Sequence, residues 1–266
     1  MPAIPATSVA NLRDLGGLPL GDGRSVRSGL VLRSAQLDRL EPDEEAVAGL
    51  KIRTVVDLRT EAERVDRPDR LPDGARAVVA DVLADQLAAS GLPPAARLKT
   101  LLGDPALAER HLGGGRIVDA MRGTYRAFVT SDSARASYRA LLTELATPGA
   151  GPLLFHCTAG KDRTGWAATV VLGLLGADEA TVREEYLAVN PAVRQAFAPL
   201  IEGFVTQGGD PELVLALIGV RPEYLDAALE EVATRHGSLE AYVRDGLGVP
   251  DDLTALLRER LTVYAA

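Results

Sequence analysis

One segment constrains the fold of this chain more than any other, because an apolar strand, a short polar turn and an apolar helix follow one another without a break. Residues 152–157 read PLLFHC, a run typical of a buried strand, and residues 165–176 read GWAATVVLGLLG with helical spacing. A buried strand that leads into a buried helix belongs in a layered α/β fold, where helices cover the faces of a sheet. The polar turn then lies at the end of a strand.

Other segments fit the same layered plan. LVLRSAQL (30–37), TVVDLRT (54–60) and ARAVVADV (75–82) are strand candidates, and EPDEEAVAGL (41–50) is a helix candidate with acids in its first turn. Strands separated by helices predict a central, mostly parallel sheet flanked by helices.

The chain from residue 116 onward is mostly helical in pattern. Helical spacing runs over residues 121–129, 134–146, 165–176, 181–190, 191–205, 222–237 and 251–264. Gly176 and Gly237 stand where C-terminal glycine caps fall. We therefore expect one α/β domain over residues 1–266 with a helical C-terminal half.

Residues 86–116 break this regular pattern. They hold three prolines and the run Gly-Gly-Gly at 113–115, with leucine and alanine patches between these breaks. Two interpretations stay open. The segment is either an ordinary surface insertion or a helical lid over a site, because lids combine chain breakers with short apolar helices.

Composition limits the functions that this chain can have. The net charge of the 266 residues is −8, which argues against a nucleic-acid-binding surface but leaves room for a small basic pocket. Cys157 is the one cysteine, so no intramolecular disulfide is possible, and a structural zinc site is not expected. We see no signal-peptide pattern and no apolar run of about 20 residues. We expect a cytoplasmic protein without a membrane segment, and we favour a monomer; export without a signal peptide stays open.

The polar turn carries the chemistry. It reads FHCTAGKDRTG over residues 155–165, so Cys157 stands at a strand end and Arg163 near the start of a helix. A turn of this length wraps one phosphate group, because its backbone N–H groups point inward and the helix dipole adds positive potential. The candidate phosphate-binding residues are Thr158, Ala159, Gly160, Lys161, Asp162 and Arg163.

The same environment favours the thiolate of Cys157, which is the nucleophilic form of a cysteine. The planar fork of Arg163 binds two phosphate oxygens and follows them into the transition state. Lys161 adds a second cation. The Thr164 hydroxyl is expected to stabilise the departing sulfur, and His156 is expected to orient the loop rather than act as a base.

Plainer interpretations of the turn fit less well. A lone cysteine in an apolar strand is usually a small buried hydrophobe, but the polar and glycine residues spaced around Cys157 favour a reactive site. A nucleotide-binding P-loop requires glycine and serine or threonine where Phe155 and Asp162 stand, so that motif is rejected.

His-Cys, five residues and then Arg-Thr resembles the signature loop of the protein tyrosine phosphatase superfamily. The full HCTAGKDRTG (156–165) is similar to the loop of atypical dual-specificity bacterial phosphatases, the subgroup of mycobacterial protein tyrosine phosphatase B. Lys161 also resembles the lysine in the loops of phosphoinositide phosphatases. Further segments that resemble the bacterial subgroup are NLRDLGG (11–17), LRS (32–34), VDLR (56–59), GVRPEYL (219–225) and HGSL (236–239). The resemblance spans nearly the whole chain.

The resemblance implies a protein tyrosine phosphatase-like fold and a mechanism without metal or cofactor. It implies substrates that carry phosphotyrosine, phosphoserine, phosphothreonine or phosphoinositide groups. It also implies an aspartic acid on a separate loop that protonates the leaving oxygen. Asp81 stands near the end of the strand candidate over 75–82, Asp85 follows it, and Asp162 lies in the turn itself. We prefer Asp81 because it stands closest to the strand end, where acid and base groups are commonly presented.

Three further charged residues have open roles. Arg13 and Asp14 form either a plain surface ion pair or, as the resemblance suggests, a support behind the site. Arg59 is either a solvated strand end, which we prefer, or a residue that lines the substrate cleft.

Two functions follow from the sequence. The first is a phosphatase that works through a cysteinyl-phosphate intermediate on Cys157. The second is a phosphate-binding module without turnover, a pseudophosphatase that sequesters phosphorylated partners. The complete turn, with its cysteine, arginine and threonine, favours the first, and the uncertain position of the acid is the feature that favours the second.

Overall fold

The computed structural model describes residues 4–85 and 100–264. Its centre is a five-stranded sheet in the order β1-β3-β6-β4-β5. The four strands β3 (Val31–Ser34), β6 (Leu153–His156), β4 (Thr54–Asp57) and β5 (Arg76–Val79) run parallel, and the two-residue strand β1 (Arg13–Asp14) pairs antiparallel with β3. The predicted mostly parallel sheet is therefore confirmed.

Strand β6 lies between two apolar layers. Leu153 and Phe155 belong to a large core that also holds Trp166 of the helix α8 (Asp162–Leu175), whereas Leu154 belongs to a smaller core on the opposite face. Every residue of β6 is buried, which explains why its sequence is apolar without alternation.

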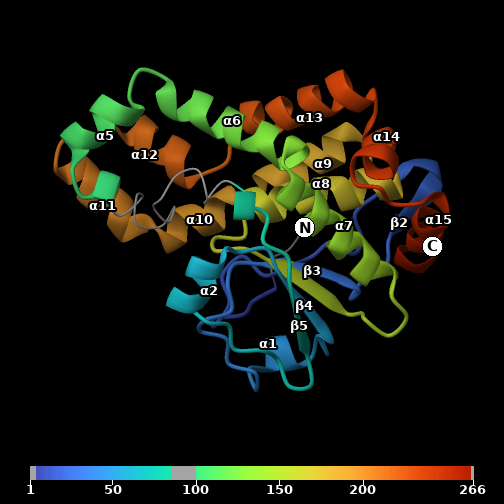
Figure 1. The fold of residues 1–266 in the computed structure, drawn as a ribbon. Helices are drawn as coiled ribbons and strands as arrows, with labels where there is room; N and C mark the ends of the chain where they lie inside the picture. Colours follow the sequence, from blue (N-terminus) through green and yellow to red (C-terminus); the bar gives the residue numbers. More distant parts are fainter. Residues whose placement is uncertain (1–3, 86–99, 265–266) are drawn as a thin grey trace.

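The two faces of the sheet have unequal cover. The large core is covered by α8 together with α6 (Arg116–Thr130), α7 (Asp132–Ala146) and α13 (Pro222–His236), which Figure 1 shows above the sheet. The smaller core is covered by the short helix α1 (Glu45–Ala48) and the N-terminal segment. Helix α2 (Glu61–Asp66) follows β4.

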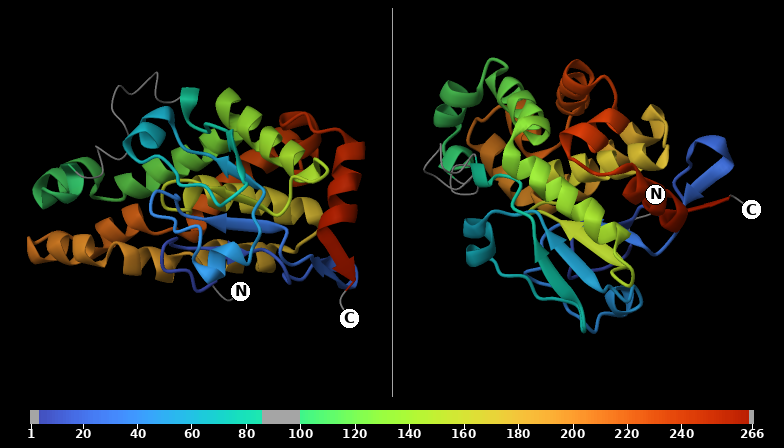
Figure 2. Two further views of the ribbon diagram at one scale, coloured as in Figure 1. Left: turned by 90° about the horizontal axis from the view of Figure 1, so that it is seen from below. Right: turned by 45° about the vertical axis from the view of Figure 1, so that its right-hand side comes forward.

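The remaining elements extend the helical layer. Figures 1 and 2 place α5, α11 and α12 at one end of the molecule and α15 with the C-terminus at the other. These elements are α5 (Pro105–Leu112), α9 (Glu179–Leu187), α10 (Asn190–Ala196), α11 (Ala198–Thr206), α12 (Pro211–Ile218), α14 (Leu239–Ala241), a π-helical turn (Tyr242–Gly246) and α15 (Asp251–Leu261), with a 3₁₀ turn (Gly21–Gly23) near the N-terminus.

Some helix boundaries could be predicted from the local sequence alone, and others could not. Gly176 and Gly237 are C-caps with φ of 97° and 79°, as predicted. The helix predicted over 191–205 is instead two helices, α10 and α11, which meet at Phe197.

The predicted helix over 251–264 is wrong for its last three residues. Thr262–Tyr264 form strand β7, which pairs antiparallel with β2 (Arg24–Val26) in a second, two-stranded sheet. Thr262 and Val263 are β-branched, which favours the extended form once a partner strand is available.

The predicted insertion or lid, residues 86–116, is described only in part. Residues 86–99 lie outside the described residues, and Pro105–Leu112 form α5. Whether the segment is a lid stays a prediction, as does the single domain. Within the described part of the chain, no helix is both long and apolar enough to cross a bilayer.

Candidate active site

The turn predicted to carry the chemistry, residues 157–163, lies at the carboxyl edge of the sheet. It follows β6, which is the central strand of the five and is flanked by β3 and β4, and it ends in the first turn of α8. We call it the phosphate loop. Ligands in parallel α/β sheets bind at this edge, outside the strand ends. Cys157 is buried as a free cysteine at the start of the loop.

Gly160 fits closely against strand β3. Its φ is +64°, and a Cβ atom added there would lie 2.3 Å from the backbone oxygen of Ser34. No other residue fits this position without displacing the loop. Thr158 holds the same strand end, because its carbonyl accepts a hydrogen bond from the Gln36 amide at 3.2 Å. The neighbouring Ala159 is half-buried.

Arg163 is held by a carboxylate that the sequence analysis did not identify. Its Nη1 and Nη2 atoms donate to the two oxygens of Glu63 at 2.7 and 2.8 Å, and both side chains are buried. Thr158 Oγ1 donates to the same carboxylate. Burial acts to raise the pKa of Glu63, but the hydrogen bond and charge of Arg163 dominate and hold it well below its usual range. Burial acts to lower the pKa of Arg163, but the pairing with Glu63 outweighs burial and raises that pKa.

Glu63 also caps helix α2. Its carboxylate accepts the backbone N–H of Thr60, whose hydroxyl accepts the Glu63 N–H, and this is the reciprocal capping box. The local signal for it was present in the sequence as Thr60-Glu61-Ala62-Glu63. The signal predicts a helix start, and it does not reveal the partner a hundred residues away.

Lys161 is bound to the end of helix α12. Its Nζ donates to the carbonyl oxygens of Leu217 and Gly219 at 2.8 and 3.0 Å and lies 3.4 Å from the Asp162 carboxylate. The lysine predicted as a second phosphate-binding cation therefore ties the loop to α12. Thr164 is fully buried, and its hydroxyl has no partner among the described residues.

The three aspartates considered for proton donation lie in different settings. Asp81 follows β5 and accepts the amides of Leu83 and Glu61 at 3.0 and 3.2 Å, and burial raises the pKa of its carboxyl. Asp85 accepts the Ser133 amide in the first turn of α7 at 2.7 Å.

Asp162 is bound through a pair of buried tyrosines. Its carboxylate accepts the Tyr125 hydroxyl at 3.1 Å, and that hydroxyl in turn accepts from Tyr186 at 2.8 Å. Asp81 combines a strand-end position with a pKa that burial raises above its ordinary value, a combination that suits a proton donor.

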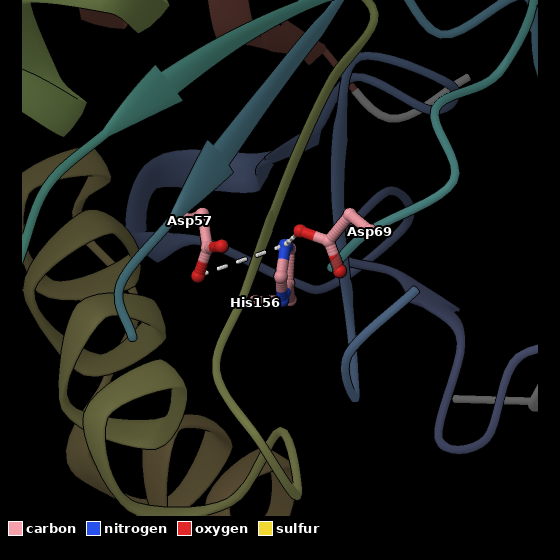
Figure 3. A group of neighbouring side chains, drawn as sticks. All are labelled: Asp57, Asp69 and His156. Carbon is pink, nitrogen blue, oxygen red and sulfur yellow. Dashed lines mark ion pairs between the residues drawn. The ribbon is translucent and has the colours of Figure 1, made fainter. Parts of the chain in front are cut away.

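His156 lies in a charged cluster behind the loop. Figure 3 shows its ring between Asp57, at the end of β4, and Asp69 on the opposite side. Its Nε2 lies 3.0 Å from Asp69 and 4.0 Å from Asp57, and its Nδ1 lies 3.4 Å from the Cys157 carbonyl oxygen. Burial acts to raise the pKa of the Asp69 carboxyl, but the contact with His156 outweighs burial and lowers that pKa to about 2.

Arg59 supplies the positive charge of this cluster, and the prediction that it is a solvated strand end is wrong. The side chain is buried and forms ion pairs with Asp57 and Asp69, both through Nη2 and at 2.7 and 2.8 Å. Ligand atoms of Asp57, Asp69 and His156 lie within 4.8 Å of one another, close enough to hold a cation, and the guanidinium of Arg59 pairs with the two carboxylates of this group.

Arg13 is also buried, so its interpretation as a surface residue is wrong. It pairs with Glu185 of α9 at 3.2 Å. Asp14 does not pair with it but accepts the amides of Gly16 and Gly29 at 2.8 and 2.6 Å. Burial, with the neighbouring Arg33, lowers the pKa of Arg13 to about 10.

The sequence pattern of the tyrosine phosphatase family matches residues 4–263. The chain belongs to the tyrosine phosphatase family. It is similar to the triple specificity protein phosphatase PtpB of Mycobacterium tuberculosis, with 34% identity over 83% of this chain and 87% of that protein. It is also similar to a putative tyrosine-protein phosphatase of Cupriavidus necator, with 31% identity over 91% of this chain and 83% of that protein. The family resemblance found in the loop therefore extends along the whole chain.

Proposed function

We propose that the chain is a cysteine-dependent phosphatase that hydrolyses phosphotyrosine through a cysteinyl-phosphate intermediate. The observation that carries the proposal is the placement of Cys157 and Arg163 at the two ends of one loop, between the central strand and the start of α8. A helix N-terminus and inward-facing amides favour both a bound phosphate and a thiolate.

The chemistry proceeds in two displacements. The thiolate of Cys157 attacks phosphorus, the bond to the ester oxygen breaks, and Asp81 gives its proton to that oxygen. A water molecule then attacks phosphorus, Asp81 takes up a proton from it, and the S–P bond breaks to release inorganic phosphate. Arg163, whose two terminal nitrogens are held by Glu63, supplies positive charge to the phosphoryl group in both steps. The buried hydroxyl of Thr164 follows Arg163 and stabilises the departing sulfur.

The substrate range is proposed to be broad. The mycobacterial relative is named a triple specificity protein phosphatase, and this supports phosphoserine, phosphothreonine and phosphoinositide monoesters as further substrates here. The partner is thus a phosphorylated protein or lipid. A monomeric state and a cytoplasmic location stay predictions.

The test is phosphate release from a panel made of a phosphotyrosine peptide, a phosphothreonine peptide and monophosphorylated phosphoinositides, with Cys157→Ser beside the wild type. We expect release from the phosphotyrosine peptide to disappear in Cys157→Ser while the circular dichroism spectrum is unchanged. Release that persists in Cys157→Ser contradicts the mechanism. Binding of phosphopeptides by the wild type without any release would instead identify a pseudophosphatase.

A further inference from the structure

A buried pair of arginines lies directly behind the phosphate loop. Arg33 of β3 and Arg13 of β1 are 0% and 2% exposed, and Glu185 of α9 is 4% exposed. Arg33 Nη1 donates to both Glu185 oxygens at 3.0 and 2.7 Å. The cluster holds two cations and one carboxylate, so one positive charge is left over inside the protein. With so little surface exposed, Arg33 does not contact a substrate.

The remaining nitrogen of Arg33 reaches the loop itself. Its Nη2 donates to the carbonyl oxygen of Gly160 at 2.7 Å, and Asn11 Nδ2 donates to the same oxygen at 2.8 Å. A backbone carbonyl with a charged donor and a neutral donor has both of its lone-pair directions taken. Gly160 is therefore the point at which β3 and the N-terminal segment fix the loop.

Peptide geometry carries this anchoring to the concave side of the loop. The C=O of Gly160 and the N–H of Lys161 belong to one planar trans unit and point in opposite directions. Since the oxygen is held against Arg33 and Asn11, the Lys161 N–H points away from β3. A charged hydrogen bond on the carbonyl polarises the peptide unit and makes its N–H a stronger donor.

We propose that Arg33 is a positioning residue of the phosphatase, which acts through the Gly160 carbonyl to aim and polarise the Lys161 N–H toward a bound oxyanion. Because amides that face into such a loop act on a cysteine sulfur as well as on a bound phosphate, the same N–H is expected to influence the reactivity of Cys157, and Glu185 holds the guanidinium in place. The proposal rests on the function proposed above, because it takes the loop as the phosphate site.

The test compares Arg33→Met with a matched control, Arg258→Met. Arg258 also donates to a backbone carbonyl, that of Leu174 at 2.9 Å, and pairs with Glu240, but it does so on α15, away from the loop. The first readout is the Kd of inorganic phosphate by calorimetry, in a Cys157→Ser background. The second is the rate at which iodoacetamide alkylates the protein at pH 6, which reports Cys157 alone because it is the one cysteine.

We expect Arg33→Met to weaken phosphate binding by about tenfold, the loss of one hydrogen bond from a charged donor. We expect the alkylation rate to fall several-fold, and Arg258→Met to change neither readout. A folded Arg33→Met protein with wild-type phosphate affinity and wild-type alkylation overturns the proposal and leaves Arg33 a packing role.

Two further variants keep the test decisive if Arg33→Met does not fold. Arg33→Lys keeps the charge and loses the fork, and Asn11→Ala removes the neutral donor alone. The proposal requires Arg33→Lys to weaken phosphate binding more than Asn11→Ala does, and the opposite order contradicts it. Neither readout uses turnover. A wild type that binds phosphate but hydrolyses no substrate therefore refutes the proposed function without touching this inference.

Discussion

Replacement of Glu63 tests how much the buried ion pair between Glu63 and Arg163 contributes to stability. Glu63→Ala removes the carboxylate that receives both terminal nitrogens of Arg163, at 2.7 and 2.8 Å, in a place where the arginine is 8% exposed. Without Glu63, the buried Arg163 guanidinium loses the carboxylate that contributes most to offsetting the cost of its burial. The loss of one partner of a buried ion pair costs about 3–5 kcal/mol.

A second, smaller loss comes from helix α2. Glu63 is one half of its capping box with Thr60, and the loss of a capping interaction costs about 1 kcal/mol. The total, about 4–6 kcal/mol, is a large part of the stability of an ordinary domain, about 5–15 kcal/mol. With a urea slope of about 3 kcal/mol per molar, the unfolding midpoint falls by roughly 1.3–2 M.

The assay is urea unfolding followed by circular dichroism, with Glu144→Ala as control. Glu144 pairs with Arg76 on the surface, and such pairs contribute about 1 kcal/mol or less. We expect kcat/KM of Glu63→Ala to fall as well, because Arg163 is no longer held in one orientation. A Glu63→Ala protein within about 0.5 kcal/mol of the wild type would refute the reasoning that this pair is a buried, mutually dependent one.

Two more predictions concern the acid and the histidine cluster. Asp81→Asn is expected to lower kcat on a phosphotyrosine peptide by about 100-fold, because general acid catalysis usually contributes a factor of this size. Its phosphate affinity is expected to stay unchanged. Asp85→Asn serves as the control, and equal losses of kcat in both variants would remove Asp81 from the mechanism. Asp69→Asn is expected to lower the melting temperature at pH 7 by roughly 5 °C. The folded-state pKa of Asp69 is about 2, below its ordinary 3.8, so its stabilisation is complete above pH 4 and is lost as the pH falls from about 4 to about 2. The difference between Asp69→Asn and wild type must therefore shrink over that range in thermal melts, and a constant difference would contradict it.

The local sequence pattern correctly predicted the segments whose structure depends mainly on residues close by in the sequence. Strand β6, the phosphate loop and α8 follow one another directly, so periodicity and a short motif were enough to place them. Gly176 and Gly237 were likewise predicted as caps, because the left-handed conformation after a helix favours glycine.

The residues that the sequence analysis missed act across long separations. Glu63 reaches Arg163 from 100 positions away and Glu185 reaches Arg33 from 152. An acidic side chain on a short helix is usually exposed to solvent. Nothing in the neighbouring sequence distinguishes an acidic side chain that is buried. Arg59 was misjudged for a different reason: its partners Asp57 and Asp69 are near in the sequence, but the sequence does not show that this strand end is buried. The strand β7 was missed because its partner β2 lies more than 200 residues earlier in the chain.

The arrangement of these ion pairs explains how an acidic chain, with net charge −8, presents a site for phosphate. Glu63 holds Arg163 and Glu185 holds Arg33, while Asp57 and Asp69 are matched by Arg59 and lie beside His156. Each carboxylate approaches its cation from behind or beside the loop, so the cations are fixed before a ligand arrives. Fixed dipoles and charges stabilise a transition state without the reorganisation that water needs. The acidic residues near the site therefore do not oppose phosphate binding; they hold in place the groups that would otherwise rearrange when the phosphate binds.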